Sequence, residues 1–181
     1  GKMGKEIISI MNEHENELVF KCDIEGELYS EKPRVLIDFS LPVVLEKTIE
    51  YVLKFKSPLI IGTTGFNEAH IKKIHELSET VPVVQSYNFS VGIQMLIQCA
   101  NLLKEKLTDW DIEISETHHR FKKDKPSGTA IMIKNALEKE VNISSLRLGN
   151  VVGEHSLSFG GLGETLTITH SALSRRTFAE G

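Results

Sequence analysis

Residues 58–65 read PLIIGTTG, and this stretch decides the fold class. Its apolar half shows no alternation with polar residues, which is typical of a strand that is buried on both faces. Its glycine-rich half precedes a helical pattern at residues 67–77, for which Asn67 is the expected N-cap. A buried strand, a tight loop and a helix are the parts of a parallel βα unit.

The same order of elements recurs on both sides of this stretch. Further strands are expected at residues 18–22, 34–39 and 81–85, and further helices at residues 5–11 and 43–55. This alternation predicts an α/β fold with a Rossmann-like parallel sheet that is covered on both faces. Ligands of such sheets bind beyond the carboxyl ends of the strands.

The glycine-rich loop after the strand of residues 58–61 is a candidate cofactor-binding segment. Its residues are Gly62, Thr63 and Thr64. Backbone N–H groups and the helix dipole favour an anion at such a position. A tight turn that needs glycine explains the loop equally well, so the alternative stays open.

The start of the chain offers a second candidate. Gly1, Lys2 and Met3 precede a helix, as the end of a dinucleotide-binding glycine loop would. Asp23 lies about 20 residues further on, where such folds place an acid against the ribose hydroxyls. An ordinary helix start would look similar.

The pattern changes near residue 90. A long helical stretch at residues 93–107 leads to residues 110–116 (WDIEISE), in which apolar and polar residues alternate strictly. The same period of two returns near residues 157 and 166, on either side of a turn. These features predict a second, α+β domain with a mainly antiparallel sheet.

The predicted domains follow from this change. Residues 1–89 are expected to bind a dinucleotide, with residues 176–181 returning toward them, and residues 90–175 to bind the substrate and to form the oligomer. Both ends of the chain look truncated, because the chain opens on Gly1 without a starting methionine.

Bulk composition excludes several function classes. The chain is 40% hydrophobic and 25% charged with a net charge of -4, which gives no reason to expect nucleic acid as a partner. Apolar runs stay below the roughly 18 residues that span a bilayer, so no membrane partner is expected. Cys22 and Cys99 match no metal-binding spacing, which predicts a reduced, cytoplasmic chain without a metal site.

Residues 116–130 (ETHHRFKKDKPSGTA) carry the chemistry. A cationic run ends at Ser127 and Gly128, directly before a helical pattern at residues 130–138. Ser127 is the expected N-cap, and Gly128 lets a ligand approach the first N–H groups of the helix. Cationic side chains at an open helix N-terminus favour a carboxylate or phosphate. A solvated loop is the alternative for such a charge run.

Histidine adds proton chemistry to this segment. The imidazole of His118 titrates near neutral pH and can therefore donate or accept a proton. His118 and His119 are neighbours on a strand and point in opposite directions, so they are poor partners for one metal. We expect the histidines at positions 14, 70 and 75 to lie on helix surfaces and assign no role to His155 and His170.

The segment resembles the signature of the 4-hydroxy-tetrahydrodipicolinate reductase family, also called dihydrodipicolinate reductase. That signature reads approximately E-x-H-H-x-x-K-x-D-A-P-S-G-T-A, and the chain departs from it only at Lys125, where the family has alanine. The resemblance covers essentially the whole chain, including residues 37–40, 62–66, 88–92 and 152–155.

The resemblance implies roles for individual residues. His118 matches the acid/base histidine and Lys122 a lysine proposed as a proton donor. The substrate's carboxylates would be held by His119, Ser127, Gly128 and Thr129, with Arg175 nearby. The remaining cofactor-lining residues would be Gly62, Thr63 and Thr64, followed by Ser86, Tyr87, Asn88 and Phe89.

The implied reaction is hydride transfer from NADH or NADPH to a cyclic dicarboxylate, giving tetrahydrodipicolinate for diaminopimelate and lysine synthesis. Residue 24 is Ile, so no arginine follows Asp23 to receive a 2′-phosphate. This favours NADH, whereas Lys2 would offset the preference. The family is homotetrameric through its substrate-domain sheets. It also begins with a central strand and ends with a helix that this chain lacks, so these residues alone are expected to fold poorly or to lose cofactor affinity.

Two other function classes share part of this pattern. Another two-domain dehydrogenase would keep the parallel sheet but lack the His-His-x-x-Lys segment. A non-enzymatic anion sensor would keep the anion site without a proton donor, whereas both His118 and Lys122 are present.

Overall fold

The structure, a computed structural model, describes residues 1–23 and 25–181, and the chain forms two compact units. Unit 1 is Gly1–Tyr87 and unit 2 is Asn88–Gly181, so the division falls close to the expected boundary at residue 89. Residues 176–181 group with unit 2. Residue 24, on which the preference for NADH rests, lies outside the described residues. Among the described helices, none has the length and apolar character that crossing a membrane requires.

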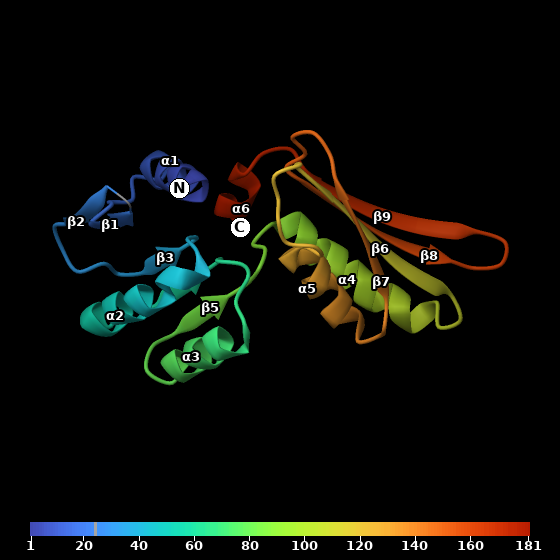
Figure 1. Ribbon diagram of the computed structural model, residues 1–181, viewed down its shortest axis with the longest axis horizontal. Coiled ribbons are helices and arrows are strands. Elements are labelled where there is room, and N and C mark those ends of the chain that lie inside the picture. The colour runs from blue at the N-terminus through green and yellow to red at the C-terminus, as the bar shows by residue number, and fades with distance from the viewer. Residues whose placement is uncertain (24) are drawn as a thin grey trace. The chain divides into compact units, whose positions relative to one another are not determined.

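Unit 1 is an α/β unit (Figure 1). Its elements are α1 (Lys2–Glu13), β1 (Phe20–Asp23), β2 (Gly26–Tyr29), β3 (Leu36–Asp38), the 3₁₀ helix η1 (Pro42–Val44), α2 (Leu45–Phe55), β4 (Leu59–Ile61), α3 (Glu68–Ser78) and β5 (Val83–Gln85). The strands β3, β4 and β5 form a parallel sheet in that order. The βα units predicted around the PLIIGTTG stretch are therefore confirmed.

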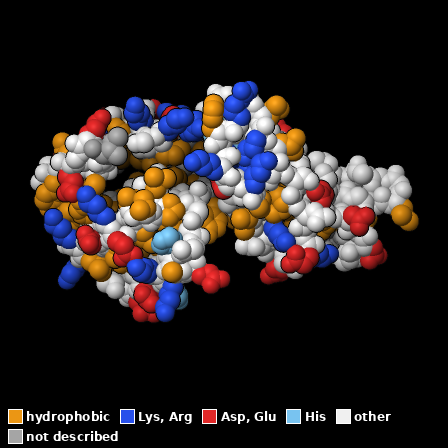
Figure 2. All heavy atoms as spheres, in the orientation of Figure 1, with side chains coloured by type: hydrophobic (Ala, Val, Ile, Leu, Met, Phe, Trp, Pro, Cys, Tyr) orange, Lys and Arg blue, Asp and Glu red, His pale blue; other side chains and the backbone are white. Residues whose placement is uncertain are grey.

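One face of this parallel sheet is buried. Leu59 and Ile61 of β4 pack with Val52 of α2 and Leu77 of α3 in a single apolar cluster. On the opposite face Ile37 is 40% exposed and Val84 55% exposed. Figure 2 shows hydrophobic side chains, in orange, between the charged ones over unit 1. Within residues 1–23 and 25–87, the predicted cover on both faces is thus seen on one face only.

The strand expected near residues 18–22 pairs differently from the prediction. β1 pairs antiparallel with β2, and the two form a separate hairpin rather than part of the parallel sheet. Gly26 adopts φ +129°, a conformation that favours glycine, at the start of β2. Phe20 packs against the rings of Tyr51 and Phe55 of α2. Side-chain contacts with α2, which also include the ion pair of Glu27 with Lys47 at 3.0 Å, therefore join the hairpin to the rest of unit 1.

Unit 2 is an α+β unit. It consists of α4 (Val91–Lys106), β6 (Asp111–His118), α5 (Gly128–Leu137), β7 (Asn142–Arg147), β8 (Gly153–Gly160), β9 (Thr165–Ala172) and α6 (Arg176–Glu180). The sheet order is β7-β6-β8-β9, with β7 parallel to β6 and the other pairs antiparallel. The mainly antiparallel sheet is confirmed. The parallel edge strand β7 was not predicted.

The helices α4 and α5 lie against one face of this sheet (Figure 1). Ile114 and Leu157 are directly paired on β6 and β8 and are fully buried beneath the helices. Each such side chain contributes roughly 1.5–3 kcal/mol by leaving water. This apolar layer fixes the position of the polar side chains that follow it along the same strands.

Candidate active site

On the helix-facing side of the sheet, polar residues follow the apolar layer. Register pairs Glu116 with Ser145 on one side and with His155 on the other, and His155 with His170. One step further along β6, His118 pairs with Arg147 of β7. Since side chains two residues apart share a face of a strand, Glu116 and His118 both point toward the helices. The end of β6 is therefore a buried polar layer.

His118 is the acid/base candidate, and it is only 8% exposed. Its Nδ1 contacts Oε2 of Glu116, which is 1% exposed. Burial lowers the pKa of His118, and the carboxylate of Glu116 opposes that shift. The ring of His155 lies edge-on to that of His118, with 5.1 Å between centroids.

Arg147 holds the carboxylate of Glu116. Its Nη1 donates to Oε2 at 3.0 Å and its Nη2 donates to Oε1 at 2.9 Å. Burial alone would raise the pKa of Glu116, but hydrogen bonds from Arg147, Ser145 and His118 outweigh it and lower the pKa to about 2. Glu116 is therefore ionised at neutral pH. Sequence reasoning missed Arg147, because only the pairing of β7 with β6 brings it to the site.

The N-terminus of α5 lies at the same end of the sheet. Ser127 caps the helix as predicted, since its Oγ accepts from the N–H of Ala130 at 3.2 Å. The same Oγ lies 3.2 Å from Nε2 of His155. Thr129 Oγ1 accepts from Nδ2 of Asn88 at 2.9 Å. With these side chains engaged, the backbone N–H groups of the first turn are what α5 offers to an anion.

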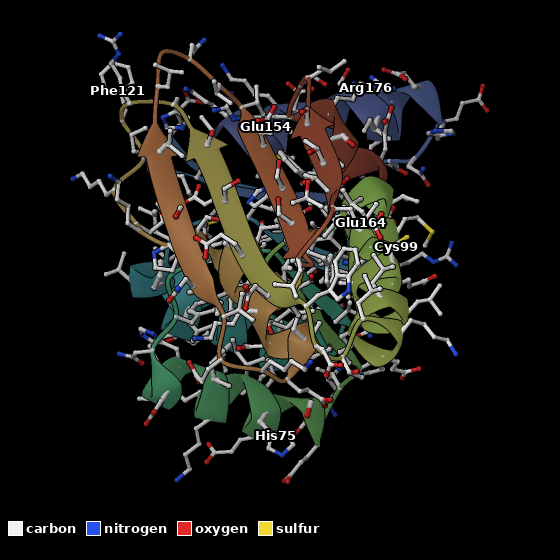
Figure 3. All side chains as sticks on the ribbon, turned by 90° about the vertical axis from the view of Figure 1, so that its right-hand side faces the viewer. His75, Cys99, Phe121, Glu154, Glu164 and Arg176 are labelled. Atoms are coloured by element: carbon white, nitrogen blue, oxygen red, sulfur yellow. The ribbon has the colours of Figure 1, made fainter. Side chains whose placement is uncertain are left out.

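The cationic loop between β6 and α5 is tied to the sheet. Lys122 forms an ion pair with Asp124 at 2.9 Å, and its carbonyl oxygen accepts from Nε of Arg147 at 3.3 Å. Phe121, 77% exposed, stands beyond the end of β6 in Figure 3. Arg175 directly precedes α6, three residues after β9 ends at Ala172. Unit 2 thus carries all of the expected acid/base and carboxylate-binding residues.

His155 is a buried histidine that sequence reasoning left without a role. It is 3% exposed, and burial lowers its pKa to about 3, so it is neutral. Ligand atoms of Glu116, His118 and His155 lie within 4.8 Å of one another. A divalent cation there would face the guanidinium of Arg147, which already occupies both oxygens of Glu116. The arrangement favours a hydrogen-bonded acid/base group over a metal site.

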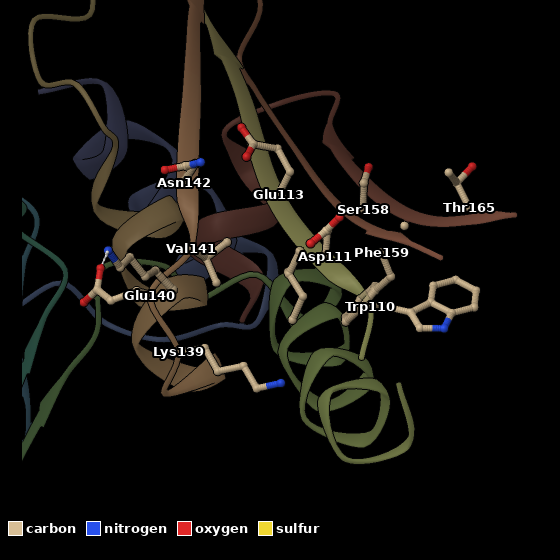
Figure 4. A pocket seen from close by; sticks show the side chains of 13 residues that line it. Trp110, Asp111, Glu113, Lys139, Glu140, Val141, Asn142, Ser158, Phe159 and Thr165 are labelled. Carbon is tan, nitrogen blue, oxygen red and sulfur yellow. Dashed lines mark hydrogen bonds and ion pairs between the residues drawn. The ribbon is translucent and has the colours of Figure 1, made fainter. Parts of the chain in front are cut away.

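A pocket of unit 2 lies at the opposite end of the sheet. It has a volume of about 630 Å³ and includes Trp110, Glu113 and Lys139 (Figure 4). Among the described residues that line it there is no histidine, and its Lys134 pairs with Glu140 at 2.8 Å. The acid/base candidates lie elsewhere, so we do not identify this pocket as the active site.

In unit 1, buried Asp38 organises the loops at the carboxyl ends of β3 and β4. It accepts from Oγ1 of Thr48 at 2.6 Å, from Oγ1 of Thr63 at 3.2 Å and from the N–H of Ser40 at 2.8 Å. The side chain of Thr63 is therefore engaged, and only its backbone remains for a ligand. A Cβ on Gly62 would lie 2.2 Å from the ring of Phe39, so packing explains this glycine.

The other expected cofactor residues occupy separate segments. Gly1 precedes the twelve-residue helix α1, and a Cβ there would meet nothing within 4 Å. Lys2 and Met3 open that helix. Asp23 lies in the hairpin and pairs with Lys21 at 2.7 Å. Its pKa is lowered by that hydrogen-bonded lysine, so the carboxylate is charged.

Comparison with known proteins identifies the family. Residues 23–89 match the family model described as dihydrodipicolinate reductase, N-terminus, and residues 92–181 match its C-terminus. The chain belongs to the dihydrodipicolinate reductase family. It is thus an oxidoreductase of the kind that uses a nicotinamide cofactor.

Individual similar proteins carry the name of the same family. The chain is 48% identical to the 4-hydroxy-tetrahydrodipicolinate reductase of Thermosipho africanus, over all of this chain and 83% of that protein. It is 38% identical to the enzyme of the same name from Rickettsia rickettsii, covering 86% of its length. A dipicolinate-bound dihydrodipicolinate reductase from Paenisporosarcina superposes with a TM-score of 0.73 at 25% identity, covering 99% of this chain and 87% of that one. Aspartate dehydrogenase from Thermotoga maritima, 13% identical with a TM-score of 0.57, shares the fold over 99% of this chain and 89% of that one.

Proposed function

We propose that this chain acts as a 4-hydroxy-tetrahydrodipicolinate reductase, which reduces a cyclic dicarboxylate to tetrahydrodipicolinate in diaminopimelate and lysine synthesis. The observation that carries the proposal is a buried, carboxylate-held His118 at the same end of the unit 2 sheet as the N-terminus of α5. The first supplies a proton, and the second supplies N–H donors for a carboxylate.

Each residue then has a task. The reduced nicotinamide, when bound, supplies the hydride, and its holders would be Gly1, Lys2, Met3, Asp23, Gly62, Thr63, Thr64, Ser86, Tyr87, Asn88 and Phe89. His118 donates the proton that completes the reduction. Lys122 adds positive charge beside it. His119, Ser127, Gly128, Thr129 and Arg175 hold the two carboxylates. Because a dianionic substrate raises the pKa of a nearby imidazole, its binding favours the protonated form of His118.

Variants at the acid/base positions test these roles. We expect His118→Gln to lower kcat by roughly 100-fold or more, the usual contribution of a general acid, and Lys122→Ala to raise KM for the dicarboxylate. The measurement is oxidation of NADH or NADPH with freshly prepared substrate. His75→Gln on α3 and Lys123→Ala, next to Lys122, are matched controls at exposed positions. Wild-type turnover in both site variants would contradict the assignment.

The cofactor itself is proposed as NADH or NADPH, with a preference for NADH because Ile24 follows Asp23. Steady-state kcat/KM for each cofactor, measured side by side, decides between them. We place the enzyme in the cytoplasm, since Cys22 and Cys99 are both free thiols.

A homotetramer built through the open face of the unit 2 sheet completes the proposal. That face carries hydroxyl pairs across β8 and β9, Ser158 with Thr167 and Ser156 with Thr169, each at 2.9 Å. We expect Thr167→Arg to lower the mass of the particle in light scattering, because a buried unpaired cation opposes association. Ser78→Arg on α3 should leave the mass unchanged. A tetramer that survives Thr167→Arg would contradict this interface.

A further inference from the structure

The carboxylate of Glu116 has no task in the mechanism above, although it is among the most buried charges of unit 2. Its side chain is fully shielded from solvent, and its hydrogen-bond partners include both terminal nitrogens of Arg147, Nδ1 of His118 and the side chain of Ser145. Burying a charge is unfavourable unless it is paired and hydrogen-bonded. A hydrophobic residue would fill this layer as well, so the carboxylate calls for a functional explanation.

The geometry around His118 supplies a functional explanation for the buried carboxylate of Glu116. Nδ1 faces Glu116, which leaves Nε2 as the nitrogen available for proton transfer. A Cβ on Gly153 would lie 3.1 Å from that Nε2, so the imidazole rests over a residue without a side chain. The ring is therefore held on one edge by a carboxylate and given space on the other.

We propose that Glu116 is the positioning residue of His118, and that Arg147 holds the carboxylate of Glu116 in the correct orientation for this task. The proposal rests on the proposed function, since it assigns a task within that reaction. Glu116 accepts the Nδ1–H and stabilises the doubly protonated imidazolium. In the protonation step the Nε2–H bond breaks, its electron pair stays on nitrogen, and a C–H bond forms from the electron pair of the substrate's enamine. The neutral imidazole keeps its Nδ1–H on Glu116 and regains a proton at Nε2 from solvent.

Arg147 also contacts the loop between β6 and α5. Its Nε donates to the carbonyl oxygen of Lys122, so one guanidinium joins the carboxylate to the cationic loop. A purely structural role, fastening that loop to β7, would use these contacts equally. The two roles differ in their effect on the proton affinity of His118.

The charged and titratable groups around His118 determine how its pKa changes in each variant. Glu116 on its own strand raises the pKa of His118, whereas Lys122 of the loop and Arg147 of β7 lower it. His155 of β8 is neutral. A general acid works in its protonated form, so activity falls as pH rises through its pKa. Removing the Glu116 charge moves that fall to lower pH, and removing the Arg147 charge moves it to higher pH.

The experiment compares Glu116→Gln with Arg147→Met in the full chain. We expect Glu116→Gln to lower kcat at least about tenfold, to leave KM for the dicarboxylate within about threefold, and to shift the falling limb of kcat to lower pH. Arg147→Met should shift that limb the opposite way. Glu113→Gln is the matched control: it lies on the same strand three residues earlier and hydrogen-bonds Ser144. Unchanged limbs in both variants, or a shift in the same direction, would overturn the proposal.

A readout without substrate separates this proposal from the proposed function. ¹⁵N NMR of His118 should show the neutral ring protonated at Nδ1 in the wild type, and a mixture of tautomers in Glu116→Gln. If the wild type does not turn over the dicarboxylate yet shows this tautomer change, the function is wrong and the positioning stands. Should Glu116→Gln fail to fold, Glu116→Asp serves instead: it keeps the charge and shortens the reach, so we expect kcat to fall without the large shift in pH. A wild-type tautomer in Glu116→Gln overturns the inference, and so does a wild-type kcat in Glu116→Asp where only that variant folds.

Discussion

Gly153 shows how a single residue shapes the acid/base site. It is buried on β8 beside the ring of His118. A Cβ atom at this position would lie 3.1 Å from Nε2 of that ring. Its backbone is ordinary extended strand, so packing, and not conformation, explains the glycine. The site thus depends on an absent side chain as well as on those present.

Gly153→Ala should therefore disturb His118 while leaving the fold intact. The new methyl group approaches Nε2 at 3.1 Å, so the ring must move by a few tenths of an ångström. We expect kcat to fall severalfold and the urea midpoint to change little. Gly160→Ala on the same strand is the control, because nothing lies within 4 Å of its Cβ. Equal kcat values for the two variants would contradict the account.

Some individual residues of the candidate site can be predicted from the sequence, and others cannot. His118, Lys122 and Ser127 fall in one continuous segment, so spacing and charge are enough to single them out. Arg147 and His155 reach the site only through strand register, which pairs them with His118 and Glu116. The alternation of β8 predicts which side His155 faces, but no local pattern fixes its partner.

Among the elements, α5 has a first turn whose cap residue also contacts a buried histidine of the candidate site. Ser127 Oγ accepts from the N–H of Ala130 and contacts His155, so one hydroxyl completes the helix and holds a buried ring. α3 in unit 1 has a comparable cap: Asn67 accepts from the N–H of His70 at 2.9 Å, and His70 Nδ1 accepts in return from Asn67 N–H. Both caps were predicted in type, since Ser and Asn precede helical patterns.

Removing each cap gives a matched pair of variants. Ser127→Ala and Asn67→Ala should each lower the free energy of unfolding of their unit by about 1 kcal/mol. Only Ser127→Ala should also weaken binding of dipicolinate, because α5 is the helix whose N-terminus we propose as a carboxylate site. Calorimetric titration measures the binding, and circular dichroism with urea measures stability. Equal dipicolinate affinity in the two variants would remove α5 from the binding site.

The hairpin of β1 and β2 is the element whose pairing was predicted wrongly. Phe20 and Cys22 were interpreted as part of a buried strand, but Lys21 and Asp23 alternate with them and pair with each other at 2.7 Å. That alternation is typical of an antiparallel strand with one polar side. The short run of residues 18–22 was too brief to separate the two patterns.

For the whole molecule, buried neutral histidines link stability to pH. The pKa of His155 in the folded chain, about 3, lies below its ordinary value of 6.5. The unfolded chain therefore binds more protons between these values, and stability is lost as pH falls from 6.5 toward 3. Burial lowers the pKa of His118 and His170 as well, so both act in the same direction.

Unfolding measured at several pH values tests this link. Between pH 6.5 and 5 the wild type should lose stability more steeply than His155→Gln, by up to about 1.4 kcal/mol per pH unit. Trp110 is the single tryptophan of the chain and lies in unit 2, so its fluorescence follows the relevant unit. His75→Gln, at an exposed position, should keep the wild-type slope. An unchanged slope in His155→Gln would show that this ring is not buried neutral.

The ordered layers of the unit 2 sheet have one further consequence. Strand side chains alternate, so a slip of one residue between β6 and β8 would turn Glu116 and His118 to the open face and bring Ser115 and Thr117 beneath the helices. The same slip would expose Ile114. A mispaired chain would thus lose its acid and its core together. The register that buries the core therefore also sets the position of the candidate acid/base group.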